Sequence, residues 1–431
     1  MHPIIPLLLS LSPLVAANPF ALPADFHRFA PRQQGATWQA CNDNSGTKGC
    51  TRFEVPLDYA NEAAGKASLM VARYPATKEP KLGTLFLNPG GPGGSGIELI
   101  LGSNADVIMN TVGGRYDLVS WDPRGVGDSH PRADCFATGR EENAFWEGTI
   151  PRAGLEARGN FTDPADLQAF YAQVPEVDQL LRDLGQKCLQ YSPDTFQYVG
   201  TAATVRDMVA LHDLLEGPDK PIDYWGFSYG TVIGIYLVNM FPNRVGRVVI
   251  DGMVDPTYWA NRPAHEIWAI NAESSDEALT GFVQACAAAG PNGCAIASSG
   301  STVDTLREWI RQLLDSAYDY KKAAGALAEF DSADVRAILF QGMYTPTGWP
   351  KLAEELKAKY DFLASNMRSS TKRSPHNHKR RRTSTGNAGV QTRQNTQANP
   401  DPPPVYSIQA ITCADAVDAG NVTTQMVFDE M

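Results

Sequence analysis

Residues 226–230 read Gly-Phe-Ser-Tyr-Gly and place a serine between two glycines at the spacing G-x-S-x-G. The apolar segment 221–225 before them is typical of a buried strand, and the apolar residues of 231–241 recur at helical spacing. A strand, this pentapeptide and a helix form a nucleophile elbow, a strained turn that exposes the serine Oγ. The pattern therefore predicts that Ser228 is a nucleophile. The alternative is a tight turn whose serine caps the next helix.

A second motif follows the apolar strand expected at 84–87. Residues 88–96 read Asn-Pro-Gly-Gly-Pro-Gly-Gly-Ser-Gly, and so many glycines indicate that the backbone approaches another group closely. Next to a nucleophilic serine that group is an oxyanion, which binds N–H donors from such a loop and from the residue after the serine. Because Pro92 has no N–H, we assign the donors to Gly91 and Tyr229. The alternative, a phosphate-binding loop, lacks the expected Gly-Lys-Ser/Thr sequence.

Two further apolar segments extend the pattern. Residues 116–121 are predicted to form a strand before the loop 122–129, which reads Asp-Pro-Arg-Gly-Val-Gly-Asp-Ser. Residues 247–252 are predicted to form a strand after the helix that follows Ser228. The order is strand and glycine loop, strand and Asp-x-Arg-Gly loop, strand and serine elbow, helix and strand. This order is that of one half of an α/β-hydrolase sheet.

Together these motifs resemble the secreted tripeptidyl aminopeptidases and their proline iminopeptidase relatives, which are serine exopeptidases of the α/β-hydrolase fold. The resemblance extends over residues 38–260 and is looser from 260 to 431. One departure is Pro123, where the family more often has glutamine. The matching segments are Trp38, Cys41, Cys50, 55–59, 88–96, 121–127, 226–231 and 241–256.

The resemblance implies an α/β-hydrolase fold with a mostly parallel sheet flanked by helices and a helical cap inserted over the active site. It also implies an acyl-enzyme on Ser228 and the release of short peptides or single residues from peptide N-termini. The peptide substrate would need an acidic anchor for its amino terminus. Glu266 and Glu273 are candidates, although most such glutamates are simply solvated. Asp251 and Asp255 belong to the family motif, and turn capping is their structural alternative.

The base that would activate Ser228 is harder to find. In this fold an acid and then a histidine follow the serine in the chain. The later histidines are His265, at the start of an expected cap helix, and His376 and His378, inside a basic low-complexity run. None ends a buried strand, and no strand that would carry the acid is recognisable. We therefore expect a family member truncated at its C-terminus, without the last strands of the sheet. The alternatives are a binding protein that has lost the chemistry and an esterase on the same fold.

The seven cysteines fit an extracellular chain. Spacing favours three disulfides. They are Cys41–Cys50, Cys135–Cys188 and Cys286–Cys294. Cys413 is then left over. In the resembled family a cysteine at this place pairs with a later one, and the alternative is a buried free thiol.

The N-terminus indicates secretion. Residues 4–17 are apolar and end in the small residues 15–17, which predicts a signal peptide over 1–17 and an extracellular protein. This segment is too short to span a bilayer, and no other long apolar run is present, so we expect no membrane span. Asn160 and Asn421 lie in Asn-x-Thr sequons and are predicted glycosylation sites.

The composition along the sequence suggests that the chain is organised in six parts. We expect the signal peptide at 1–17, an irregular lead-in at 18–37, the hydrolase core at 38–256, a helical cap at 257–367, a disordered basic and polar insertion at 368–404, and the start of a truncated C-terminal part at 405–431. Helices are expected at 163–190, 201–216, 264–271, 275–289, 302–317, 323–330 and 333–342. The insertion contains dibasic pairs that a secretory endoprotease could cut.

Composition agrees with a globular enzyme. A chain of 431 residues with 43% hydrophobic content can bury a large core in one α/β domain with an insertion. The net charge of −11 argues against nucleic acid as a partner. The sequence carries no recognisable cofactor motif and no cluster with metal-ligand spacing. It does not indicate an oligomeric state.

Overall fold

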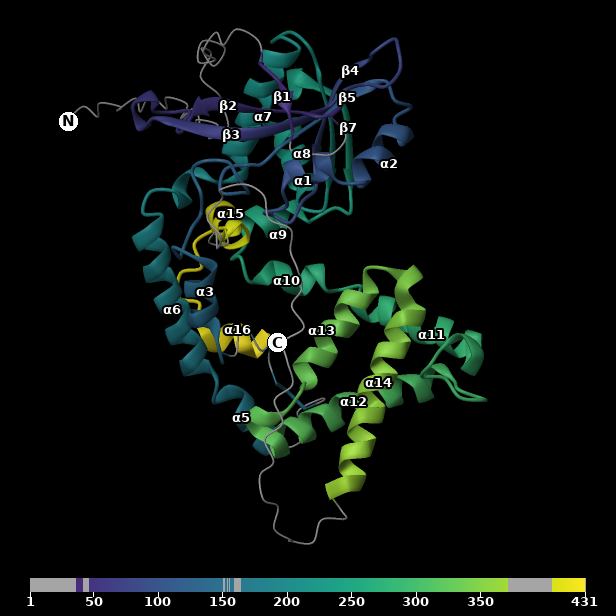
Figure 1. The fold of residues 1–431 in the computed structure, drawn as a ribbon. Helices are drawn as coiled ribbons and strands as arrows, with labels where there is room; N and C mark the ends of the chain where they lie inside the picture. The colour runs from purple at the N-terminus through teal and green to yellow at the C-terminus, as the bar shows by residue number, and fades with distance from the viewer. Residues whose placement is uncertain are drawn as a thin grey trace, which may run out of the picture. The chain divides into compact units, whose positions relative to one another are not determined.

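The computed structural model describes residues 36–41, 46–149, 152, 154, 156–158, 164–370 and 405–430. The chain divides into two compact units (Figure 1). The sheet unit comprises Met1–Arg132, Thr195–Pro256 and Ser407–Asp415, and the helical unit comprises Ala133–Asp194, Thr257–Tyr406 and Ala416–Met431. The expected signal peptide, most of the lead-in, Asn160 and most of the expected insertion lie outside the described residues.

The sheet unit is built on a seven-stranded sheet with the order β1-β2-β3-β5-β4-β6-β7. Its strands are β1 Gln39–Ala40, β2 Gly49–Pro56, β3 Lys66–Tyr74, β4 Gly83–Asn88, β5 Tyr116–Trp121, β6 Ile222–Phe227 and β7 Val245–Asp251. The first three strands and the β3–β5 pair are antiparallel, whereas β5, β4, β6 and β7 are parallel neighbours. Because parallel strands end at one edge, the loops after β4, β5 and β6 lie together.

Helices cover both faces of this sheet. The sheet unit contains α1 Gly96–Leu101, α2 Asn104–Thr111, α7 Thr201–Leu215, α8 Gly230–Met240 and α15 Ser407–Asp415, with short turns η2 Glu62–Ala64, η3 Phe196–Tyr198 and η4 Pro242–Arg244. Leu85 and Leu87 share a core cluster with Ile108 of α2, whereas the Phe86 ring lies 6.0 Å from the ring of His212 on α7. Since successive strand side chains point to opposite faces, α2 and α7 cover opposite faces of the sheet.

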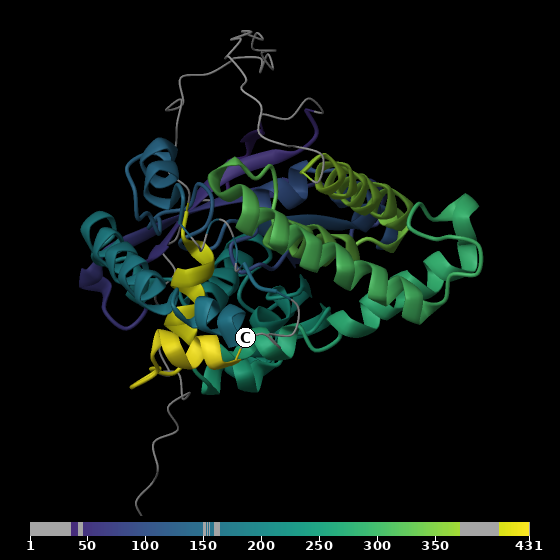
Figure 2. The ribbon, with the colours of Figure 1, turned by 90° about the horizontal axis from the view of Figure 1, so that it is seen from below.

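In the residues that the structure describes, all regular elements of the helical unit are helices. They are α3 Gly139–Trp146, α5 Pro164–Tyr171, α6 Val174–Tyr191, α9 Pro256–Asn261, α10 Glu266–Asn271, α11 Ser275–Gly293, α12 Val303–Ala324, α13 Ser332–Met343, α14 Trp349–Ser370 and α16 Thr424–Glu430, with turns η5 Gly325–Leu327 and η6 Pro346–Gly348. Leu306, Ile310 and Leu313 of α12 share one buried stripe at helical spacing. This stripe packs against Val335 of α13 and Leu356 of α14, and Figure 2 shows these helices as one group.

Several sequence expectations can be compared with these elements. The expected α/β-hydrolase fold class, a sheet flanked by helices, is confirmed. The sheet is mixed rather than mostly parallel, because β1, β2, β3 and β5 pair antiparallel with one another. The helix expected at 323–330 is wrong, because α12 continues to Ala324 and then stops at Gly325, whose φ is +58°. Helix α14 was not anticipated as a separate element. Residues 133–194 were expected in the hydrolase core but belong to the helical unit.

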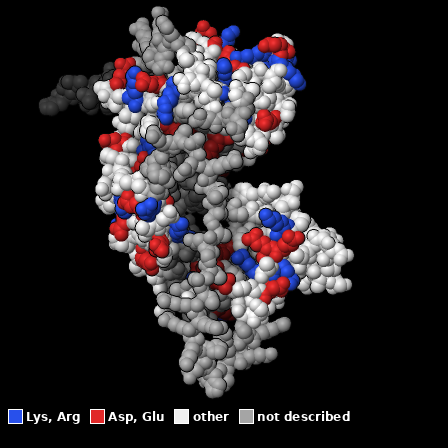
Figure 3. All heavy atoms as spheres, in the orientation of Figure 1, with Lys and Arg blue, Asp and Glu red and all other residues white. Residues whose placement is uncertain are grey.

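The cysteines pair as the spacing suggested. Disulfides join Cys41 to Cys50, Cys135 to Cys188, and Cys286 to Cys294. Cys413 is free and exposed on α15, so the alternative of a buried thiol is wrong. No described helix is both long and apolar enough to cross a bilayer. On the face drawn in Figure 3, acidic and basic side chains are interspersed.

Candidate active site

Ser228 lies on the turn between β6 and α8. Its φ is +53°, and among the described residues it is the one non-glycine residue in the left-handed region. That conformation costs an L-residue about 1–2 kcal/mol, so neighbouring bonds have to hold it. The Ser228 N–H donates to Asp251 O at 2.9 Å, and both the N–H and Oγ1 of Thr231 donate to Ser228 O. The serine itself is exposed, as a nucleophile requires.

Glycines allow the backbone to close around this turn. A Cβ placed on Gly226 would lie 2.2 Å from Gly230 O, and one on Gly230 would lie 2.8 Å from Asn88 O. A Cβ on Gly234 would lie 2.9 Å from Ile250 Cγ2. Side chains at these positions would force β4, β6, β7 and α8 apart. Gly226 and Gly230, the two glycines of the G-x-S-x-G pattern, therefore allow the close approach of strand and helix that the motif predicts.

The loop 88–96 lies directly against the elbow. A Cβ on Gly90 would be 2.8 Å from Ser228 Cβ and 3.1 Å from Tyr229 N, and the φ of Gly90 is +92°. The Gly90 N–H donates to Asn88 Oδ1 at 2.9 Å, and the Gly94 N–H donates to Gly90 O. The Gly91 N–H makes no hydrogen bond with a described residue. The structure thus brings the loop of Gly91, Ser228 and Tyr229 together.

Tyr229 is the N-cap residue of α8 and is almost fully buried. Burial raises the pKa of its phenol well above 10.0, and the negative charge of Asp415 raises it further. Its hydroxyl lies 2.6 Å from Oγ1 of Thr201. The phenol therefore stays protonated, and the ring is anchored in the interior beneath the proposed oxyanion donor. Sequence reasoning found Tyr229 as the residue after the serine but missed the buried contacts of its side chain.

Asp122 directly follows β5 and supports the glycine loop, although the sequence indicated it only as part of a loop. Its carboxylate accepts hydrogen bonds from Ser95 Oγ at 2.6 Å, Ile97 N at 3.2 Å and Asp128 N at 3.1 Å. Burial raises its pKa above 3.8, although these hydrogen bonds oppose the shift. Asp122 thereby ties the glycine loop to the loop 122–129. Its position directly after a buried strand was the available signal.

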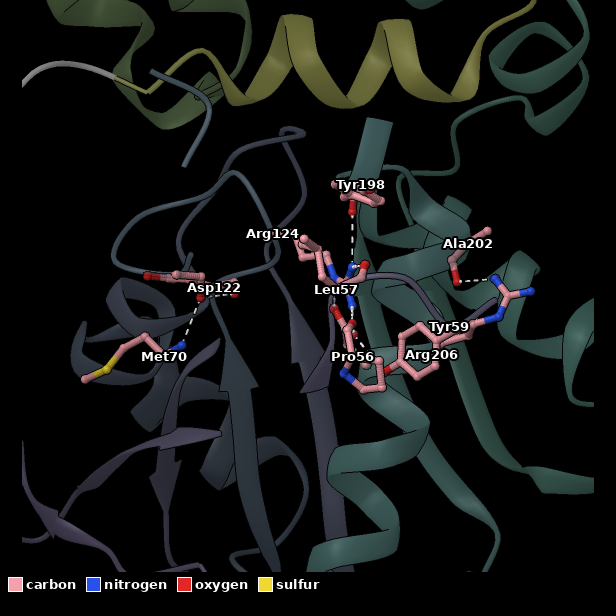
Figure 4. Close-up of polar contacts among 11 residues, drawn as sticks. Pro56, Leu57, Tyr59, Met70, Asp122, Arg124, Tyr198, Ala202 and Arg206 are labelled. Carbon is pink, nitrogen blue, oxygen red and sulfur yellow. Dashed lines mark hydrogen bonds and ion pairs between the residues drawn. The ribbon is translucent and has the colours of Figure 1, made fainter. Parts of the chain in front are cut away.

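Arg124 in the same loop points into the interior rather than toward the serine. Nε and Nη2 of Arg124 donate to the two carboxylate oxygens of Asp207 on α7 at 2.7 and 2.8 Å. Figure 4 shows the same guanidinium directed at the backbone oxygens of Pro56 and Leu57. Tyr59 Oη donates to Asp207 at 2.8 Å. This cluster joins the loop, α7 and the segment after β2.

Arg124 and Asp207 form a buried ion pair, with Nε 2.7 Å from Oδ2. Burial by itself would lower the pKa of Arg124, but the charge and hydrogen bonds of Asp207, together with Tyr59, raise it above its usual value. Both side chains are 0% exposed. The Asp-x-Arg-Gly motif is therefore a structural support for the site. Its arginine does not face a substrate-accessible surface.

Neither described histidine of the sheet unit is hydrogen-bonded to Ser228. His212 is buried on α7 with Nδ1 3.2 Å from Arg244, and His130 pairs through its backbone with Ser68. Ser228 Oγ makes no hydrogen bond with a described residue.

The other candidates named from the sequence are distributed as follows. His265 lies in the helical unit, and His376 and His378 lie outside the described residues. The backbone oxygen of Asp251 accepts the hydrogen bond from Ser228 N–H in the elbow. In the helical unit, Oε2 of Glu266 lies 3.8 Å from Nη1 of Arg262. Glu273 and Asn421 are exposed.

A family model described as alpha/beta hydrolase fold matches residues 83–320. Serine protease Hip1 of Mycobacterium tuberculosis is 29% identical over 341 residues, which are 76% of this chain and 60% of that protein. Tripeptidyl aminopeptidase of Streptomyces lividans is 29% identical over 48% of this chain and 36% of its own length. Carboxylesterase B of Mycobacterium tuberculosis is 31% identical over 53% and 41%. The chain thus spans 60% or less of the length of these relatives.

Proposed function

Because the chain belongs to the α/β-hydrolase fold family, we propose that it is a secreted serine hydrolase that uses Ser228 to cleave peptides near their N-termini. The observation that carries this proposal is the strained, exposed Ser228 with the glycine loop packed against it. Strain of this kind persists where function requires the side chain to project from the backbone. The relatives named serine protease and tripeptidyl aminopeptidase favour a peptide substrate.

The chemistry would proceed by acyl transfer. Ser228 Oγ attacks the scissile carbonyl carbon and loses its proton to a general base, and the carbonyl oxygen becomes an oxyanion. The N–H groups of Gly91 and Tyr229 are the proposed donors to that oxyanion, each worth about 3 kcal/mol. The amine then leaves with a proton, and water releases the acyl group from Ser228. The proposal requires a base that the described residues of the sheet unit do not supply.

Two other functions have specific support. The similarity to carboxylesterase B favours ester substrates on the same serine. The lack of a base beside Ser228 among the described residues of the sheet unit favours a binding protein without catalysis. Extracellular localisation is supported by the expected signal peptide and by the three disulfides.

A fluorophosphonate probe separates these functions. The activated serine attacks phosphorus and fluoride leaves, so labelling reports a working nucleophile. We expect labelling of the purified chain that is lost in Ser228→Ala and kept in Ser103→Ala, an exposed serine of the sheet unit that caps no backbone group. A folded chain that is not labelled would contradict the hydrolase and favour the binding protein. Turnover of an aryl ester without any turnover of a tripeptide amide that has a free N-terminus would favour the esterase.

A further inference from the structure

Helix α15 contacts the glycine loop at its first residue. Ser407 is buried, and its Oγ donates to Gly125 O at 2.5 Å. A Cβ placed on Gly93 would lie 2.9 Å from Ser407 Cβ, so the two backbones meet without room for a side chain. Gly93 belongs to the loop that carries the proposed donor Gly91. The N-terminal end of α15 therefore limits where this loop can lie.

The last residue of α15 contacts the start of α7. Asp415 Oδ1 accepts a hydrogen bond from the Thr201 N–H at 2.7 Å, and Oδ2 accepts one from Thr201 Oγ1. Gly200 is the N-cap residue of α7 and offers no side-chain acceptor. A carboxylate at a helix N-terminus satisfies free N–H groups and interacts favourably with the helix dipole. Asp415 provides this cap from a distant part of the chain.

The same threonine contacts the residue after the nucleophile. Thr201 Oγ1 lies 2.6 Å from the hydroxyl of Tyr229, and both side chains are at most 1% exposed. An ionised carboxylate can only accept hydrogen bonds, so the hydroxyl of Thr201 donates a hydrogen bond to Asp415. Thr201 Oγ1 must then accept from Tyr229. The negative charge of Asp415 thus determines the direction of the whole hydrogen-bonded chain.

We propose that α15 positions both halves of the oxyanion hole, and that Asp415 is the positioning residue that orients Tyr229 through Thr201. The inference rests on the proposed function. At one end α15 restrains the loop that contains Gly91. At the other end it anchors the side chain of Tyr229, the residue whose backbone N–H is the second proposed donor. Asp415 acts on Tyr229 through the hydrogen bonds of Thr201. A donor displaced by a fraction of an ångström stabilises an oxyanion less well.

The test combines labelling kinetics with hydrogen–deuterium exchange. In Asp415→Ala and Thr201→Val we expect the amides of 226–236 to exchange at least about threefold faster than in the unaltered chain. The second-order rate constant for fluorophosphonate labelling of Ser228 should fall about tenfold, less than for outright loss of a donor. Thr201→Ser keeps the hydroxyl and should restore both values. Asp418→Ala is the control, because Asp418 is exposed and its carboxylate accepts from Gly420 N.

A double variant separates positioning from simple helix capping. Tyr229→Phe removes the hydroxyl that receives the effect, so adding Asp415→Ala should lower the labelling rate no further. Faster exchange confined to α7, with 226–236 and the labelling rate unchanged, would overturn the proposal. Additive losses in the double variant would overturn it too. If the unaltered chain is not labelled, the proposed function fails and the exchange of 226–236 alone decides whether α15 positions the elbow.

Discussion

Asp207→Asn removes the charge that balances Arg124 in the interior of the sheet unit. Arg124 Nε and Asp207 Oδ2 are 2.7 Å apart, and both side chains are 0% exposed. Breaking a buried pair by changing one partner costs about 3–5 kcal/mol, because the other charge is left without compensation. Tyr59 Oη also donates to Asp207, and weakening a buried hydrogen bond adds about 1 kcal/mol. Together these losses should lower the free energy of unfolding by about 4–6 kcal/mol.

Urea unfolding followed by tryptophan fluorescence measures this loss as a shift in midpoint. An exposed ion pair of the same length provides the matched control. Lys66 Nζ and Glu54 Oε2 are also 2.7 Å apart, but their side chains are 65% and 50% exposed. Glu54→Gln should cost about 0.2–1 kcal/mol, because water already solvates both charges.

The comparison can refute the reasoning. Equal losses in Asp207→Asn and Glu54→Gln would show that burial does not control the energy of this pair. The double variant Arg124→Met/Asp207→Leu offers a second check, because an apolar pair removes both charges together. It should be more stable than Asp207→Asn alone. A double variant that is less stable than Asp207→Asn would mean that the backbone contacts of Arg124 dominate.

Three further predictions concern the loop, alkaline pH and the sheet edge. Gly90→Ala should slow fluorophosphonate labelling at least about tenfold, because the new Cβ would lie 2.3 Å from Phe227 O. Gly113→Ala is the control and should leave the labelling rate unchanged, because Gly113 also has a positive φ of +72° but has open space around it. Burial and, to a smaller extent, the charge of Asp415 raise the pKa of Tyr236 from 10.0 to about 12. The protonated phenol therefore stabilises the folded state fully below pH 10, and this contribution is lost as the pH rises through 12. Tyr236→Phe should therefore unfold at higher pH in an alkaline titration, and an unchanged midpoint would contradict this. Ile250 is 38% exposed on β7 at the edge of the described sheet, so Ile250→Lys should reduce light scattering on concentration, and equal scattering would argue against edge association.

The sequence was most informative where a few adjacent residues specify geometry. The elbow at 226–230 follows from neighbouring glycines and from apolar segments on either side, and the strands β4, β5, β6 and β7 were recognisable from their apolar runs. The false helix at 323–330 had the opposite cause. Gly325 takes a positive φ that ends α12, and local composition does not reveal that conformation.

The role of Arg124 depends on tertiary structure even though its loop was recognised. Asp207 lies 83 residues further along the chain, and no local pattern marks it as the partner of a buried arginine. The motif indicated a conspicuous loop. Packing of α7 against that loop turned its arginine inward and made it a support of the fold.

Sequence alone therefore determined the nucleophile candidate, the glycine loop and the class of fold, because each is encoded by residues that are neighbours in the chain. Tertiary structure alone brought Gly90 against Ser228, through the parallel pairing of β4 with β6. It also placed Asp415 on Thr201 across 214 residues of sequence. Side chains that meet only after the sheet and its helices have packed leave no periodic or compositional signal, since their relation exists in space and not along the chain.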